Sequence, residues 1–231
     1  MKIEIWSDIA CPYCYIGKNH LDTALQQFEF SDQVEVVLHS FELEPDITEN
    51  SGEGQHNAVM RKYRQSPKTA QETLDRATLA GRAVGLVIDF DRVVTTNTFN
   101  AHRLVQFAAT EGKENEMENR LFKAYFAEGK NISDLSVLQE LASEIGLDAR
   151  LILENNLFTP QVRKDEKNAR LLGIRSVPFF LFDSKYSVSG AQPVSTFLEV
   201  LRKVWSENMP LDTVMDKETE EGCVDGICHV K

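Results

Sequence analysis

The chain has 231 residues, a formal net charge of −11 at pH 7 and a hydrophobic content of 42%. This length allows one large domain or two small ones with a sizeable core. The acidic excess argues against a broad surface for nucleic acid or anionic membranes, which bind clustered Lys and Arg. Apolar runs are short and interrupted by charges, so none reaches the ~18–20 apolar residues of a membrane span. We therefore expect neither a nucleic-acid nor a membrane partner.

The N-terminus and the cysteine count together predict a location. The first residues are strand-like, and no basic region followed by an apolar core precedes them, as it would in a signal peptide. Four cysteines are too few for a disulfide framework, and in a reducing compartment such cysteines are typically catalytic or metal-binding. We expect a cytoplasmic protein in which cysteines carry the chemistry.

Cys11 and Cys14 stand where an expected strand becomes a helix. Residues 2–6 alternate polar and apolar side chains, and apolar residues recur at helical spacing after Cys14. Pro12 suits the first helical turn, so Cys11 would occupy the helix N-terminus, where unpaired N–H groups stabilise a thiolate. The pattern predicts a redox pair with Cys11 as the attacking sulfur and Cys14 as the resolving one. Half of a zinc site and a chance pair are the alternatives.

The following segments predict a sheet interrupted by a long helical region. Residues 34–41 resemble a mostly buried second strand, which gives a βαβ opening with a right-handed crossover. After a polar loop at residues 49–55 the pattern is helical as far as residue 172, with Ser133 as one expected N-cap. Candidate helices cover residues 69–84, 97–110, 115–127, 133–145 and 160–172, with glycines at or near their ends.

Strand character returns at residues 179–182 and 186–189, and their short separation predicts a hairpin. Pro193 then opens a last amphipathic helix, and from Ser206 the composition becomes acidic and polar, which predicts a poorly ordered tail. We expect a thioredoxin-like domain from residues 1–50 and 173–205, an inserted helical domain from residues 51–172, and a mobile tail from residues 206–231.

The tail carries a second pair, Cys223 and Cys228, in a Cys-x4-Cys arrangement. The Asp225-Gly226 turn between them makes a disulfide feasible, and roughly 60 Å of extended chain would let it reach Cys11. Acidic neighbours disfavour a thiolate at Cys223, so the tail pair is expected to pass electrons to the Cys11–Cys14 disulfide. A zinc site that includes His229 and incidental thiols are the alternatives.

The order strand, Cys-Pro-Tyr-Cys, helix, strand, helical insertion, Ser-Val-Pro-Phe-Phe, hairpin, helix resembles the DsbA branch of the thioredoxin superfamily. Ser7-Asp8 and the segments at residues 41–45, 97–104 and 188–192 further resemble FrnE-like proteins, which are cytoplasmic DsbA-type oxidoreductases. The resemblance implies an α/β, thioredoxin-like fold with a large helical insertion of the DsbA type.

The resemblance also implies roles for residues outside the cysteine motif. Pro178 is expected to be a cis-proline against the two sulfurs, and the Val177 backbone to pair with an extended substrate. Tyr13 is expected at the rim of the site, with a plain helix-turn aromatic as the alternative. His102 lies on the helix that lines the substrate cleft of related isomerases, and its alternative is a packed or surface residue. Asp8 either accepts a proton or caps the loop, and we favour the cap.

These features predict a thiol-disulfide oxidoreductase acting on protein or peptide disulfides and dithiols. The related hydroxychromene-carboxylate isomerases and kappa-class glutathione transferases typically carry Ser where this chain has Cys11. That difference favours dithiol chemistry over glutathione-dependent isomerisation or transfer. A non-catalytic redox sensor or zinc-binding module is the remaining alternative. The motifs require no metal or other cofactor, and glutathione enters as the thiol that the isomerase alternative would use.

Overall fold

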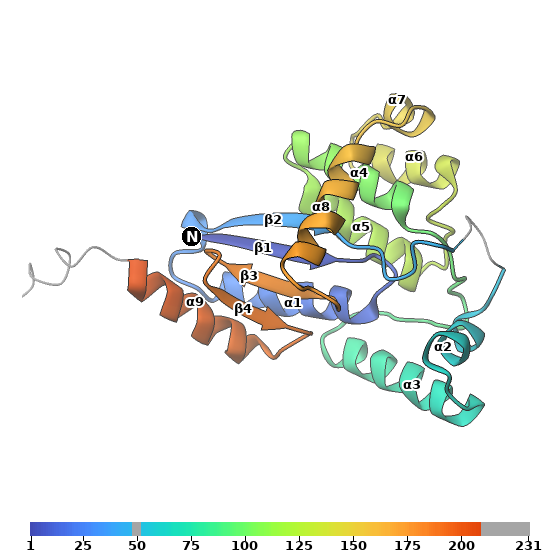
Figure 1. Ribbon diagram of the computed structural model, residues 1–231, viewed down its shortest axis with the longest axis horizontal. Helices are drawn as coiled ribbons and strands as arrows, with labels where there is room; N and C mark the ends of the chain where they lie inside the picture. Colours follow the sequence, from blue (N-terminus) through green and yellow to red (C-terminus); the bar gives the residue numbers. More distant parts are fainter. Residues whose placement is uncertain (48–51, 209–231) are drawn as a thin grey trace, which may run out of the picture.

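The computed structural model describes residues 1–47 and 52–208. Its four-stranded sheet has the order β2-β1-β3-β4. β2 (Glu35–Ser40) is parallel to β1 (Lys2–Ser7), β3 (Phe179–Phe182) is antiparallel to β1, and β4 (Tyr186–Ser189) is antiparallel to β3. The sheet thus joins the start of the chain to the segment after the helical insertion, as predicted (Figure 1).

One face of the sheet is closed by two helices. Ile3 and Ile5 of β1 lie opposite Phe182 and Phe180 of β3, and all four side chains are buried. α1 (Pro12–Gln26) and α9 (Val194–Asn208) pack against each other over this core. Phe197 of α9 contacts Phe180 with 4.8 Å between ring centroids. Ile3 and Ile5, like Phe180 and Phe182, are alternate residues of their strand and point to this face, which places the core on this side of the sheet.

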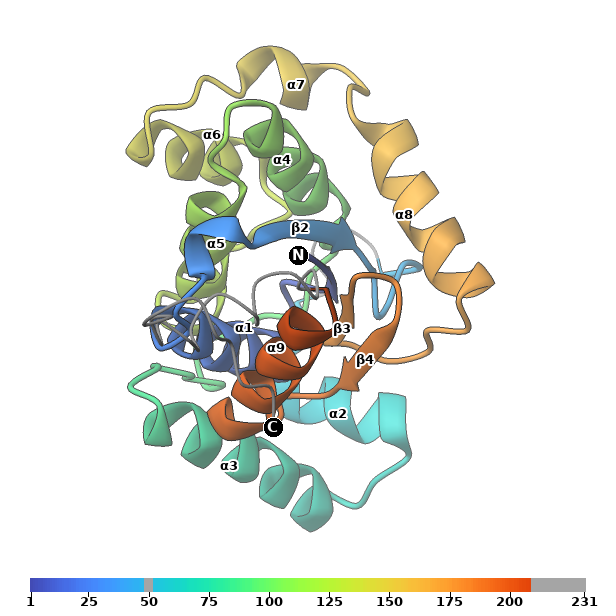
Figure 2. The ribbon, with the colours of Figure 1, turned by 90° about the vertical axis from the view of Figure 1, so that its left-hand side faces the viewer.

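In the described residues, seven helices follow β2 and precede β3 along the chain. Figure 2 shows two groups at opposite ends of the molecule, with α4 to α7 at the top and α2 and α3 at the bottom. α8 packs along β2 and against α4. No helix in the described part of the chain has the length and apolar character needed to cross a membrane. Their bounds are α2 (Gln55–Tyr63), α3 (Pro67–Ala83), α4 (Phe99–Thr110), α5 (Glu114–Phe126), α6 (Leu135–Glu144), α7 (Arg150–Glu154) and α8 (Thr159–Leu171).

The five predicted helices of the insertion are confirmed as α3, α4, α5, α6 and α8, while α2 and α7 were not predicted. α2 has nine residues and α7 has five, so both are shorter than the roughly 11–18 residues over which a helical period is recognised. The expected N-cap Ser133 is wrong. Asp134 caps α6 instead, because its carboxylate accepts the Ser136 N–H at 2.8 Å, and a negative charge is favourable at a helix N-terminus.

α9 continues to Asn208, beyond residue 206 where the composition predicts the tail to begin. Glu207 accepts hydrogen bonds from Lys185 Nζ and Tyr186 Oη, each at 2.6 Å. Asn208 Nδ2 donates to Asp183 Oδ2, also at 2.6 Å. These contacts join the last turn of α9 to the β3–β4 hairpin. Residues 209–231, which include both tail cysteines, lie outside the described residues.

His39, near the end of β2, joins the sheet to α8. Its ring stacks on Trp6 with 4.5 Å between centroids. Nδ1 lies 2.9 Å from Asp165 Oδ1, and Nε2 lies 3.1 Å from Glu4 Oε1. Burial alone would lower the pKa of His39, but the two carboxylates raise it above its ordinary value. The protonated ring therefore links β1, β2 and α8.

We expect this link to make the free energy of unfolding depend on pH. A group whose pKa is raised on folding contributes stability below its unfolded pKa, ~6.5 for histidine, and loses that contribution as pH rises through the folded value. Urea unfolding of the wild-type protein from pH 6 upward should therefore show a decline that is reduced in His39→Gln. His20 provides the control, because it is half-buried and its Nδ1 lies 2.7 Å from the Gln192 carbonyl oxygen, whereas His39 contacts two carboxylates; His20→Gln should keep the wild-type dependence. Equal dependence in all three proteins would contradict the assignment.

Candidate active site

Cys11 and Cys14 are free thiols at the start of α1. Cys11 is the N-cap residue, and Pro12 occupies the first helical turn. The turn between β1 and α1 is closed by hydrogen bonds from Cys11 N to Asp8 O and from Cys14 N to Cys11 O, each at 3.0 Å. Cys11 therefore occupies the helix end at which N–H groups and the helix dipole stabilise a thiolate, as the sequence predicts.

Cys14 lies deeper than Cys11. It is buried among the core residues, and the Asp8 main-chain N–H points to its Sγ at 3.5 Å. Burial raises the pKa of the Cys14 thiol well above its usual value, and the neighbouring Cys11 sulfur and Asp8 carboxylate raise it further. Both cysteines are buried, but their environments differ, because Cys11 lines a cavity and Cys14 does not.

The segment before β3 lies across from Cys11. The Val177–Pro178 peptide bond is cis, which confirms the expectation drawn from the family resemblance. The Cys11 thiol contacts the Val177 carbonyl oxygen at 3.6 Å. Gly17 of α1 permits this approach, since a Cβ there would lie 3.0 Å from Pro178 Cγ and 3.2 Å from Phe180 Cζ. The requirement for glycine at this helical position was not predicted, because it arises from packing between distant segments.

A cavity of about 230 Å³ opens beside Cys11. Tyr13, which is exposed, lines it together with Val177. Gln55 Nε2 donates to the buried Tyr125 Oη at 3.0 Å within the same lining. The inserted helices α2 and α3 supply the apolar side chains of Ala58, Val59, Leu74 and Ala77 to this lining, together with polar ones that include Lys62 and Thr73. A substrate group held in this cavity would lie next to Cys11.

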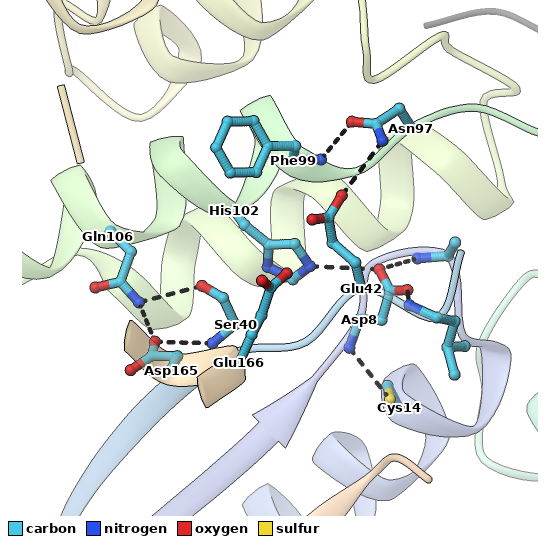
Figure 3. A network of polar contacts seen from close by, with 12 residues as sticks. Asp8, Cys14, Ser40, Glu42, Asn97, Phe99, His102, Gln106, Asp165 and Glu166 are labelled. Atoms are coloured by element: carbon cyan, nitrogen blue, oxygen red, sulfur yellow. Dashed lines mark hydrogen bonds and ion pairs between the residues drawn. The ribbon is translucent and has the colours of Figure 1, made fainter. Parts of the chain in front are cut away.

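Asp8 is buried behind the dithiol, and its carboxylate is fixed by backbone N–H groups. Oδ2 accepts from Leu43 N at 2.7 Å, and Oδ1 accepts from Ala10 N at 3.3 Å (Figure 3). These bonds confirm that Asp8 caps the loop. Burial alone would raise the pKa of the Asp8 carboxyl, but His102, the Leu43 N–H and Thr98 lower it overall. Asp8 is therefore held as a carboxylate.

His102 lies on α4 with its Nε2 3.4 Å from Asp8 Oδ1, within ion-pair distance (Figure 3). The residue is only 3% exposed, and it does not line the cavity beside Cys11. The structure thus pairs His102 with Asp8 and separates it from the cavity in which a substrate contact was expected. Sequence reasoning missed this pairing, because nothing local to either residue indicates the other.

Among residues 1–47 and 52–208, no group of three or more His, Cys, Asp or Glu side chains could hold a metal ion. The zinc alternative for the tail concerns Cys223, Cys228 and His229, which lie outside these residues. The described part of the site therefore contains two thiols that can carry out redox chemistry, with the Val177 carbonyl and a cavity beside them.

The model of the DSBA-like thioredoxin domain matches residues 2–202. The chain belongs to this family. The DsbA-like fold with a helical insertion, predicted from the sequence, is thereby confirmed.

Individual relatives agree with this assignment. A probable DsbA oxidoreductase from Streptomyces coelicolor is 36% identical, with a TM-score of 0.84 over 100% of this chain and 99% of that one. The uncharacterized protein YwbO of Bacillus subtilis (strain 168) is 29% identical over 186 residues, which cover 78% of this chain and 86% of YwbO. The cytosolic disulfide reductase DsbM of Pseudomonas aeruginosa shares the fold at 17% identity, with a TM-score of 0.63 over 90% of this chain and 100% of DsbM.

Proposed function

We propose that this DsbA-like protein is a thiol-disulfide oxidoreductase that acts on disulfides and dithiols of proteins or peptides. The observation that carries the proposal is the position of Cys11, at the N-cap of α1, 3.6 Å from the Val177 carbonyl and on the wall of a cavity, with Cys14 buried behind it. Oxidation of a dithiol peptide by the wild-type protein, and its loss in Cys11→Ser, tests it.

In the reducing direction, the Cys11 thiolate attacks one sulfur of a substrate disulfide, and the other substrate sulfur leaves as a thiolate. Cys14 then loses its proton and attacks Cys11 Sγ in the mixed disulfide. The substrate is released as a dithiol, and Cys11 and Cys14 are left joined. Oxidation of a substrate dithiol follows the same steps in reverse.

Substrate recognition in this proposal uses the surface around Cys11. The Val177 backbone pairs with an extended substrate segment, with Pro178 next to it, and the exposed Tyr13 ring contacts the substrate at the rim. Main-chain pairing of this kind gives affinity without selecting a sequence. The apolar side chains that α2 and α3 supply to the cavity then receive a substrate side chain close to the reacting cysteine.

A glutathione-dependent isomerase or transferase is the second candidate. The cavity of about 230 Å³ favours it, because its largely apolar lining beside a reactive sulfur suits a small aromatic substrate. Cys11, in place of the Ser typical of those relatives, favours the oxidoreductase. Turnover of a chromene-like substrate that requires glutathione would select the second candidate, and dithiol oxidation without glutathione would select the first.

We also propose membership of the FrnE-like branch and a cytoplasmic location. Residues 97–104, which carry part of that resemblance, form the loop and the first turns of α4 behind the dithiol. DsbM, which shares the fold, is a cytosolic disulfide reductase by name. Cell fractionation with detection of the endogenous protein tests the location.

Cys223 and Cys228 are proposed as an electron relay to the Cys11–Cys14 disulfide. We expect this disulfide to persist longer after oxidation in a chain truncated after Asn208 than in the intact protein with a reduced tail. The truncation keeps the whole of α9 and its contacts with the hairpin. Mass-spectrometric disulfide mapping at timed intervals measures the decay, and full-length Cys223→Ser/Cys228→Ser should match the truncated chain. Equal decay in all three proteins, or stoichiometric zinc lost with Cys223, would overturn the relay.

A further inference from the structure

Three buried polar residues lie together beyond Asp8. Ser7 ends β1, His102 belongs to α4 and Glu118 belongs to α5. They line a second, small cavity of about 10 Å³, distinct from the cavity beside Cys11. Asp8 lies between His102 and Cys14 (Figure 3). His102 is therefore one side chain away from the dithiol.

Each of the three residues has a buried polar atom without a hydrogen bond of good geometry: Ser7 Oγ, His102 Nε2 and Glu118 Oε2. Buried polar atoms in folded proteins are nearly always paired with protein groups or with ordered water. The cavity volume corresponds to about one water-sized sphere, and a buried water typically makes about three hydrogen bonds. Its volume and its polar lining both fit a single water molecule.

Charged groups of both signs surround these three residues and act in opposite directions on their pKa values. Burial alone would lower the pKa of His102, but Asp8, Glu42 and Glu118 raise it overall. Burial raises the pKa of Glu118, and Lys18, Ser7 and His102 oppose that rise while Asp22 adds to it. The Asp8 pKa is lowered overall, chiefly by His102 acting against the cost of burial.

We propose that His102 is a positioning residue of the dithiol cycle: its imidazolium offsets the negative charge of the Asp8 carboxylate behind Cys14, and a water molecule bound by Ser7, His102 and Glu118 completes their hydrogen bonding. This inference rests on the proposed function, because its kinetic effect is on attack by Cys14. The negative field of Asp8 opposes ionisation of Cys14, and the positive charge of His102 offsets that field. Without His102, the Leu43 and Ala10 N–H groups still hold Asp8 as a carboxylate. Cys14 would then face an uncompensated negative charge and would ionise at a higher pH.

The ionisation of His102 is tested in the wild-type protein, independently of any redox activity. An NMR titration of the imidazole should give a midpoint above ~6.5, the value for an unperturbed histidine. Asp8→Asn should lower that midpoint, since it removes the partner charge. A neutral His102 at pH 6.5 in the wild-type protein would overturn the proposal, whether or not the protein oxidises dithiols.

Kinetics test the coupling to Cys14. The measured quantity is the rate at which Cys14 resolves a preformed mixed disulfide between Cys11 and a peptide, as a function of pH. His102→Gln should move the profile upward by about one pH unit, so that resolution near pH 7 slows ~10-fold. Asp8→Asn should move it downward, and the double variant should follow Asp8→Asn. His20→Gln, on the same helix as Cys14, is the control and should leave the profile in place.

Opposite shifts distinguish positioning from structural damage, which would slow resolution in both variants without moving the profiles apart. Coincident profiles in His102→Gln and wild type would overturn the coupling. A wild-type protein that never resolves the adduct while His102 is protonated would instead reject the proposed function. The water site is tested by NMR: the wild-type protein should show NOEs between a long-lived water molecule and the His102 ring, and Ser7→Val should lose them. The absence of these NOEs in the wild-type protein would overturn the water site.

Discussion

Cys11→Ser should abolish dithiol oxidation and disulfide reduction, with turnover falling by about 10³-fold or more. The thiolate is the nucleophile in these reactions, and a hydroxyl group in its place forms no mixed disulfide. The substitution keeps the size of the side chain at the N-cap of α1. Unfolding curves should therefore stay close to those of the wild-type protein, which separates loss of chemistry from loss of structure. Oxidation of a dithiol peptide followed by mass spectrometry measures the effect.

Cys14→Ala should behave differently, because it leaves the attacking sulfur in place and removes the resolving one. Incubation with a disulfide peptide should accumulate a covalent adduct on Cys11, visible on a non-reducing gel and absent from Cys11→Ala/Cys14→Ala. Retained turnover in Cys11→Ser would remove Cys11 as the nucleophile. Failure of Cys14→Ala to form any adduct would reverse or remove the two assigned roles.

The elements that sequence predicts best are those with a local cause. The alternation in β1, the proline in the first turn of α1 and glycines with positive φ such as Gly112 and Gly146 each act within a few residues of themselves. Backbone preference and side-chain period are local properties, so they can be read without the fold. The cis geometry of Val177–Pro178 is not of this kind, since most X-Pro bonds are trans, and it was expected only from the family resemblance.

The site is less predictable than the fold, because its polar contacts join distant segments. The Asp8–His102 pair connects the β1–α1 turn to α4, and the wall of the cavity at Ala58 and Ala77 comes from α2 and α3. Neither residue type nor spacing indicates such partners. A histidine on an amphipathic helix is equally compatible with a cleft or a core, and only the buried carboxylate next to it decides between them.

Arg103, the neighbour of His102 on α4, is a buried cation that binds the chain around α7. Its Nε donates to Leu157 O at 2.8 Å, and its Nη1 donates to Asn100 Oδ1 at 2.8 Å. Nη2 donates to the carbonyl oxygens of Ile152 and Asn155. The planar guanidinium suits this task because its donors point in several fixed directions. One side chain thereby holds the short α7 and the segment leading into α8 against α4.

Arg103→Met should lower the free energy of unfolding by about 3–5 kcal/mol, since it leaves carbonyl groups unpaired in a buried position. The free energy of unfolding of Arg103→Lys should lie between those of the wild-type protein and Arg103→Met, because one ammonium group does not reach all of the same acceptors.

Arg92→Met is the matched control. Arg92 is exposed and donates to a single carbonyl, that of Ala127, so its loss should cost less than about 1 kcal/mol. Urea unfolding measures all three, and equal losses in Arg103→Met and Arg92→Met would show that the buried guanidinium does not hold α7 in place. Arg103 does not line the cavity beside Cys11, so dithiol oxidation per folded molecule should remain near the wild-type rate.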